Sequence, residues 1–196
     1  MSGLLSLRIR GYPFDLDSDE SRWSDTHLRC FLQRSACTIT SLHVERLTIT
    51  DDQMLSLLQM ISTLESLYIE ELREDHETLV NLIITATFLD RFAVNPCLDS
   101  LFSVPLVPRL TDLKLVVHAE DIQADRVLNA ITSRWLPEPT HAAEIGVECL
   151  RSVAIVVMLD DADQQGGCLD ALLGLRDAGM RLAITYGDVD ELYPDE

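Results

Sequence analysis

The chain has 196 residues, and 47% of them are hydrophobic, which suffices for one domain with a sizeable core and excludes wholesale disorder. Its formal net charge is −18, and residues 47–196 carry the whole imbalance, with nine basic and 27 acidic residues. Such a surface repels phosphate backbones and anionic lipid head groups, so we expect neither nucleic acid nor membrane partners.

The cysteines and the N-terminal segment indicate where the protein resides. The five cysteines are odd in number and form no C-x-x-C pair. Residues 1–10 contain no apolar signal segment, and apolar runs such as 154–159 are too short to span a bilayer. We therefore expect a reducing, cytoplasmic or nuclear setting.

The first half of the chain alternates strand and helix patterns. A strand over 4–9 leads through a polar insertion at 11–23 into a helix that includes Leu32. The spacing L-x-x-L-x-L then appears in 39–44 and again 25 residues later. Between the two, Thr50-Asp51-Asp52-Gln53 has the form of a helix capping box, and apolar residues at helical spacing follow it.

The same alternation continues to the C-terminus. A helix around 79–86 precedes a further strand, and a longer helix over 124–135 is stopped by Pro137 and Pro139. We expect 140–148 to be a loop and a last short helix to end at Ala178-Gly179. The strands expected in chain order are 4–9, 39–44, 64–69, 89–94, 110–115, 150–158 and 182–184.

A fixed period with one strand and one helix per unit is typical of a leucine-rich-repeat solenoid. We therefore predict an α/β fold, a leucine-rich-repeat solenoid (horseshoe) of about seven parallel strands with helices on the convex side. Residues 1–187 would form a single leucine-rich-repeat domain, and residues 188–196 would be a frayed acidic tail.

No pattern of catalytic or metal-binding residues stands out. The densest carboxylate group, Asp160-Asp161-Ala162-Asp163, starts like a calcium loop, but Leu172 occupies the position of the bidentate glutamate. The histidines are scattered, and no glycine-rich phosphate loop is present. We expect no enzymatic activity, no cofactor and no bound metal.

The side chains between the apolar strand positions should face outward on one concave sheet. Solenoids commonly use such a surface for recognition, and Arg and Tyr dominate interface hot spots. The alternative is that these side chains only satisfy their neighbours in the sheet. The expected protein-binding residues are Arg8, Arg10, His43, Glu45, Tyr68, Glu70, Asn95 and Lys114.

Several stretches resemble the leucine-rich-repeat portion of fungal F-box-like proteins: FLQRSACTITSLHVERLTITDDQMLSLL, ISTLESLYI, VPRLTDLKLVV and CLRSVAIVV. In that family an N-terminal F-box docks on the Skp adaptor of a cullin-type ubiquitin ligase, and the repeats are thought to select substrates. The resemblance therefore implies a non-enzymatic module that binds a partner protein, with substrate recognition in a ubiquitin ligase as its role. Components of such a ligase are the further partners that it implies.

This chain departs from the family because no F-box precedes the strand at 4–9. A fragment, a truncated relative, and a protein whose insertion at 11–23 covers the first strand all fit this departure. The alternative function is an inert structural or decoy repeat protein that competes with a full-length F-box relative. Lys114 is the only lysine, which either a codon bias toward arginine or selection against ubiquitin acceptors would produce.

Overall fold

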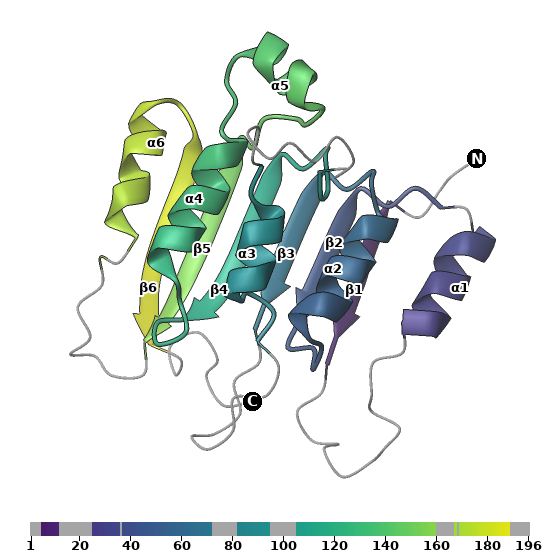
Figure 1. The fold of residues 1–196 in the computed structure, drawn as a ribbon. Helices are drawn as coiled ribbons and strands as arrows, with labels where there is room; N and C mark the ends of the chain where they lie inside the picture. Colours follow the sequence, from purple (N-terminus) through teal and green to yellow (C-terminus); the bar gives the residue numbers. More distant parts are fainter. Residues whose placement is uncertain are drawn as a thin grey trace.

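One sheet of six parallel strands organises the protein, and the strands follow one another in chain order (Figure 1). The computed structural model describes residues 5–11, 25–35, 37–71, 82–94, 105–159, 167 and 169–188. Its elements are β1 (Ser6–Arg10), α1 (Asp25–Ser35), β2 (Ser41–Glu45), α2 (Asp51–Met60), β3 (Ser66–Glu70), α3 (Ala86–Phe92), β4 (Asp112–His118), α4 (Ala124–Arg134), α5 (Pro139–Ile145), β5 (Ser152–Leu159), the 3₁₀ turn η2 (Asp170–Leu172), α6 (Leu173–Asp177) and β6 (Arg181–Asp188).

The strands are stacked in strict register. Leu42 on β2 lies beside Leu67 on β3, and Leu67 lies beside Leu113 on β4. The entries to β2, β3, β4 and β5 repeat one hydrogen-bond pattern, in which a single carbonyl accepts the N–H groups of two successive residues on the next strand. The accepting carbonyls belong to Leu5, Thr40, Glu65 and Thr111. This α/β arrangement of parallel strands and helices confirms the predicted fold class, a repeat-like parallel sheet.

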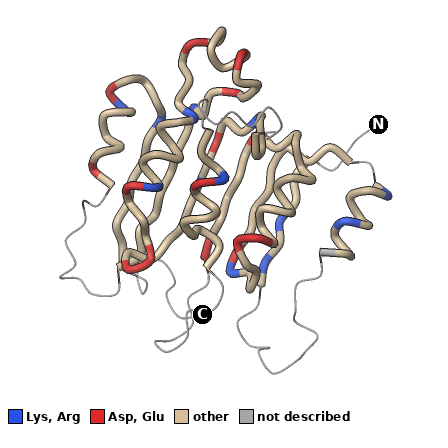
Figure 2. The backbone as a smooth tube through the Cα atoms, viewed as in Figure 1, with Lys and Arg blue, Asp and Glu red and all other residues tan. Residues whose placement is uncertain are grey.

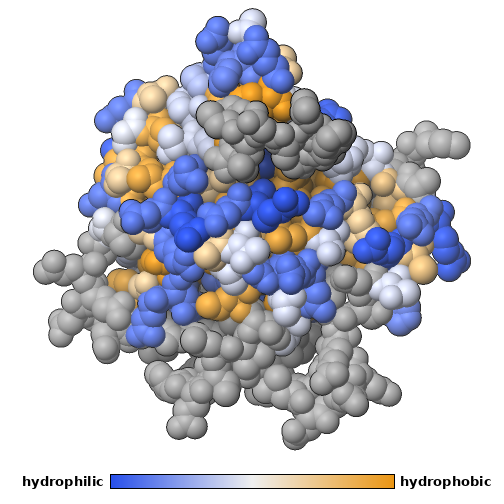
Figure 3. All heavy atoms as spheres, viewed as in Figure 1, coloured by the Kyte–Doolittle hydropathy of each residue, from blue (hydrophilic) through white to orange (hydrophobic). Residues whose placement is uncertain are grey.

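The described helices α1, α2, α3, α4 and α6 lie along one face of the sheet (Figure 1). The apolar side chains that alternate along the strands, such as Leu42, Val44 and Ile69, are buried beneath these helices. The outer surface of the helix layer is largely polar, with apolar side chains between (Figure 3). We call the opposite surface the helix-free face, since none of the described helices packs on it.

The predicted capping box at the start of α2 is present. The Thr50 side chain accepts the N–H of Gln53, and the Gln53 side chain accepts the N–H of Thr50. Two orphan N–H groups of the helix are thereby satisfied. The helix then buries Met54, Leu57 and Leu58 against the sheet, as its apolar spacing predicts.

The prediction of a strand at 89–94 is wrong, because residues 89–92 belong to helix α3 and Ala93 is its C-cap. The residues Leu89 and Phe92 are three apart, a spacing that suits a helix as well as a strand. Thr85 decides for the helix by accepting the N–H of Phe88 as an N-cap. The described residues therefore contain six strands rather than about seven, and 46 residues separate Leu67 from its neighbour Leu113.

The loop predicted at 140–148 is also wrong, because its first part is helix α5. Pro139 occupies the first turn, where its missing N–H costs nothing, and Gly146 ends the helix with a left-handed φ of 78°. The prolines that stop α4 therefore also start a second helix, which protrudes beyond the sheet (Figure 1).

Several predictions fall outside the described residues: the insertion at 11–23 beyond Gly11, the acidic group from Asp160 and the tail at 189–196. The prediction of a helix around 79–86 is wrong over the described residues 82–85, which are not helical, because α3 begins only at Ala86. The last described strand extends to Asp188, one residue beyond the predicted domain end. None of the described helices is both long and apolar enough to cross a membrane.

Candidate functional site

The helix-free face carries its side chains in rows, because the strands are parallel and in register. Each row takes one residue from every strand. The row through the middle, which we call the central row, changes from large polar side chains at β1 to alanines at β6. Its members are Arg8, His43, Tyr68, Lys114, Ala154 and Ala183.

Three neighbours in the central row touch through the ring of Tyr68. The His43 and Tyr68 ring centroids are 5.5 Å apart with the planes tilted by 30°. On the other side, the ammonium of Lys114 lies over the Tyr68 ring, 4.9 Å from its centroid. Aromatic and cation–π contacts of this kind fix the side chains relative to one another without strong bonds. The result is a continuous aromatic and cationic surface across β2, β3 and β4.

Glu45 anchors two arginines at the β1 side of this face. Its Oε1 atom is 2.6 Å from Nη2 of Arg8, and its Oε2 atom is 3.6 Å from Nε of Arg10. The glutamate side chain is 6% exposed, whereas the two arginines are 65% and 58% exposed. The hydrogen bond and the charge of Glu45 raise the pKa of Arg8. Both carboxylate oxygens of Glu45 are thus paired with arginines, while the guanidinium groups of Arg8 and Arg10 remain exposed to solvent.

Glu70 lies beside Glu45 on the next strand and is occupied in the same way. Its Oε1 atom accepts from Nε of Arg46 at 2.7 Å, and its Oε2 atom accepts from the Tyr68 hydroxyl at 2.8 Å. Two carboxylates side by side on neighbouring strands repel each other. The arginines around them offset this repulsion, and Glu70 holds the Tyr68 ring in place from its hydroxyl end.

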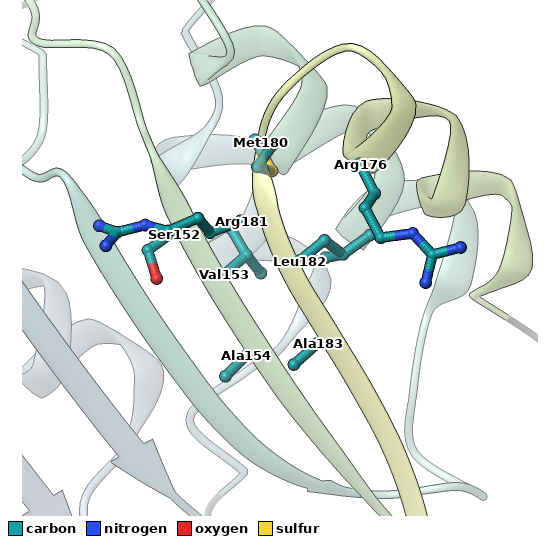
Figure 4. A pocket seen from close by; sticks show the side chains of 8 residues that line it. All are labelled: Ser152, Val153, Ala154, Arg176, Met180, Arg181, Leu182 and Ala183. Atoms are coloured by element: carbon teal, nitrogen blue, oxygen red, sulfur yellow. The ribbon is translucent and has the colours of Figure 1, made fainter.

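At the other end of the central row the side chains are small and the surface is hollow (Figure 4). Ala154 and Ala183 lie side by side on β5 and β6, and Arg181 reaches from β6 across β5 (Figure 4). Arg181 ends 3.4 Å from Asp112 on β4. The hollow has a volume of about 360 Å³. Its lining combines Ser152, Ala154, Arg181 and Ala183 with Val153, Met180 and Leu182, which belong to the core side of the strands, and with Arg176 of α6.

The structure brings together all but one of the residues that the sequence predicts for protein binding. The exception is Asn95, which lies outside the described residues. Sequence reasoning missed Arg46, whose left-handed φ of 48° returns its side chain to Glu70. It also missed Arg181, because the predicted strand started one residue later.

Two further buried charges are structural. Arg134 is fully buried and donates to the carbonyls of Phe92, Val107 and Leu106, while its guanidinium lies over the Phe92 ring. Glu71 accepts the N–H groups of Ile83 and Ile84 at 3.0 and 2.7 Å. Glu71 ties the segment before α3 to the end of β3, and Arg134 ties the end of α3 and residues 106–107 to α4.

No group of three or more potential metal ligands occurs among the described residues. A second hollow, of about 870 Å³, lies between α5 and the starts of β5 and β6. Its lining is mainly apolar and includes Trp135, Pro137 and Val147, with Arg151 at its border. Comparison of the chain with known protein families, with curated proteins and with solved structures found no match.

Proposed function

We propose that this protein is a non-enzymatic interaction module that binds a partner protein through the helix-free face of its sheet. The observation that carries the proposal is the aligned set of arginine, histidine, tyrosine and lysine side chains at its β1 to β4 end. These residue types are enriched in interfaces, where a rigid ring or a guanidinium group provides most of the binding energy.

Pre-organisation supports the same proposal. Tyr68 is held by His43, Lys114 and Glu70, so it loses little rotational freedom when a partner covers it. Glu45 holds Arg8 in the same way. A partner would therefore meet side chains that are already held in place.

We also propose that the chain is a leucine-rich-repeat protein related to the F-box-like family. The repeated strand entries support this proposal. The same carbonyl hydrogen bonds recur between successive repeats, and each repeat buries an apolar residue just before its strand: Ile39, Leu64, Leu110 or Leu150. On this basis the partner would be a substrate, and the module would serve a ubiquitin ligase.

The test of partner binding is affinity isolation from native cells with two matched triple variants. One replaces Arg8, His43 and Tyr68 with alanine on the helix-free face. The control replaces Gln59, Arg126 and Asn129, which are exposed on α2 and α4. We expect the first variant to lose its specific partner at an unchanged melting temperature while the control retains it. Equal retention by both would contradict the proposal.

The ligase role has a separate test in the same isolation. We expect a Skp-type adaptor or a cullin to accompany the wild-type protein, directly or through the partner. Recovery of other partners without any ligase component would remove the ligase role and leave the binding role in place.

A further inference from the structure

The accessible charges of the helix-free face are basic, although the chain as a whole is strongly acidic. Its described cations are Arg8, Arg10, Arg46, Lys114 and Arg181, against three carboxylates, Glu45, Glu70 and Asp112. The two glutamates are 6% and 9% exposed and Asp112 is 43% exposed, whereas Arg8, Arg10 and Arg181 are 65%, 58% and 74% exposed. Acidic residues are spread over the described helices and connections (Figure 2). The face is therefore a local cationic surface on a protein of charge −18.

The cations are spaced across the strands rather than along them. Arg8 and Arg10 lie on the first strand, Lys114 on the fourth and Arg181 on the sixth. With about 4.8 Å between neighbouring strands, they span about 24 Å. An extended peptide of about seven residues covers this length.

The hollow over Ala154 and Ala183 also restricts which side chain a partner can place at this end of the face. In register, Lys114 lies beside Ala154, and Arg181 borders the hollow from the strand entries (Figure 4). An apolar side chain of a partner would fill the hollow, and a neighbouring carboxylate would meet one of the two cations. Opposite charges across an interface steer association and select partners.

We infer that the segment recognised by this face is an acidic, extended peptide of a partner protein, which crosses the strands and seats one bulky apolar side chain over Ala154 and Ala183. This inference rests on the proposed function and specifies its partner. A nucleic acid is disfavoured because the remainder of the chain repels a long polyanion.

The experiment selects a phage library of random dodecapeptides on the full chain. We expect the selected pool to be enriched in Asp and Glu around a Leu, Phe or Trp, relative to the starting library. Synthetic peptides from the pool should bind at least about tenfold more weakly to a variant carrying Lys114→Glu and Arg181→Glu. They should also weaken as salt rises from about 0.05 M to about 0.5 M.

Two further variants make the test specific. Arg126→Glu reverses one charge on the helix side, where Arg126 pairs with Asp90, and should leave binding unchanged. Ala183→Trp fills the hollow and should reduce binding by at least about tenfold without lowering the melting temperature. A labelled ten-nucleotide oligothymidylate should not bind, and tight Tyr68-dependent binding of it would overturn the inference.

The outcomes separate the two proposals. A pool that is not acidic, but whose binding still requires His43 and Tyr68, would overturn this inference and retain the binding face. A pool that depends on none of the substituted residues, or no enrichment at all, would overturn both.

Discussion

At the scale of single residues, Glu71 combines burial with two backbone hydrogen bonds. It follows β3 directly, and its Oε1 atom accepts the N–H groups of Ile83 and Ile84 ahead of α3. Burial raises the pKa of Glu71 to about 7, the hydrogen bonds oppose this rise, and the charge of Asp121 adds to it. The segment before α3 is thus attached to the sheet through a carboxyl group that titrates near neutrality.

Replacing Glu71 with glutamine should remove a pH dependence of stability. In the unfolded chain the carboxyl ionises at its usual pKa of 4.5, and in the folded protein at about 7. The folded state therefore holds more protons between these values, and the free energy of unfolding falls as pH rises through this window. The loss is about 3 kcal/mol in total. Urea unfolding at several pH values checks it. Identical pH profiles for the wild type and Glu71→Gln would contradict the assignment.

Arg134 should be among the most sensitive residues for stability. Burial lowers its pKa to about 10, so the guanidinium remains charged at neutral pH and satisfies three carbonyls. Arg134→Met leaves those carbonyls buried without a donor, which we expect to cost about 3 kcal/mol. Arg126→Met, at an exposed ion pair, is the control and should cost less than about 1 kcal/mol. Chemical denaturation would measure both, and equal losses would refute this role.

At the scale of elements, the sequence was most informative where one pattern excludes the others. Residues 39–69 have a two-residue alternation at each end and a capping box between, and the structure shows strand, helix and strand there. Residues 89–94 were misassigned because an apolar spacing of three fits both helix and strand, and the cap at Thr85 lies outside that motif. A short apolar motif therefore predicts helix or strand correctly only when the capping residues on either side of it are considered as well.

The side chains of the candidate site were predictable because strand alternation alone decides which residues face outward. Arg8, His43, Tyr68 and Lys114 follow from that rule once the strands are placed. Arg46 does not, since nothing in the local sequence requires a non-glycine residue at a φ of 48°. The contact of Arg46 with Glu70 also joins residues on successive coils, which a linear pattern does not reveal.

The absence of a side chain at Gly11 allows the end of β1 to lie close to the end of β2. A Cβ atom at this position would lie 2.1 Å from the carbonyl oxygen of Arg46, and the Gly11 N–H donates to Glu45 at 2.9 Å. Gly11→Ala should therefore separate the strand ends and cost about 2 kcal/mol or more. Gly146→Ala, with open space but a φ of 78°, should cost about 1 kcal/mol. Thermal unfolding compares them, and a smaller loss at Gly11 would contradict this packing.

At the scale of the whole molecule, the hydrophobic core and the proposed recognition surface lie on opposite faces of the sheet. The helices and the inward side chains of the strands form the core, while the other sheet face is left to polar rows. The chain as a whole carries a net charge of −18, so long-range repulsion should disfavour most polyanions, while short-range pairing with the cations of the helix-free face would still admit the proposed acidic peptide.

Lys114 offers the most direct measurement of whether a partner covers the central row. It is the only lysine of the chain, is exposed, and lies over Tyr68 in the middle of that row. Acylation by an amine-reactive reagent, followed by digestion and mass spectrometry, separates Lys114 from the α-amino group. Isolated partner complexes should show Lys114 acylated at least about tenfold more slowly than the free protein, since a fully covered hot-spot residue is shielded from solvent. Equal acylation of Lys114 in the free protein and in a saturated complex would contradict binding through this face.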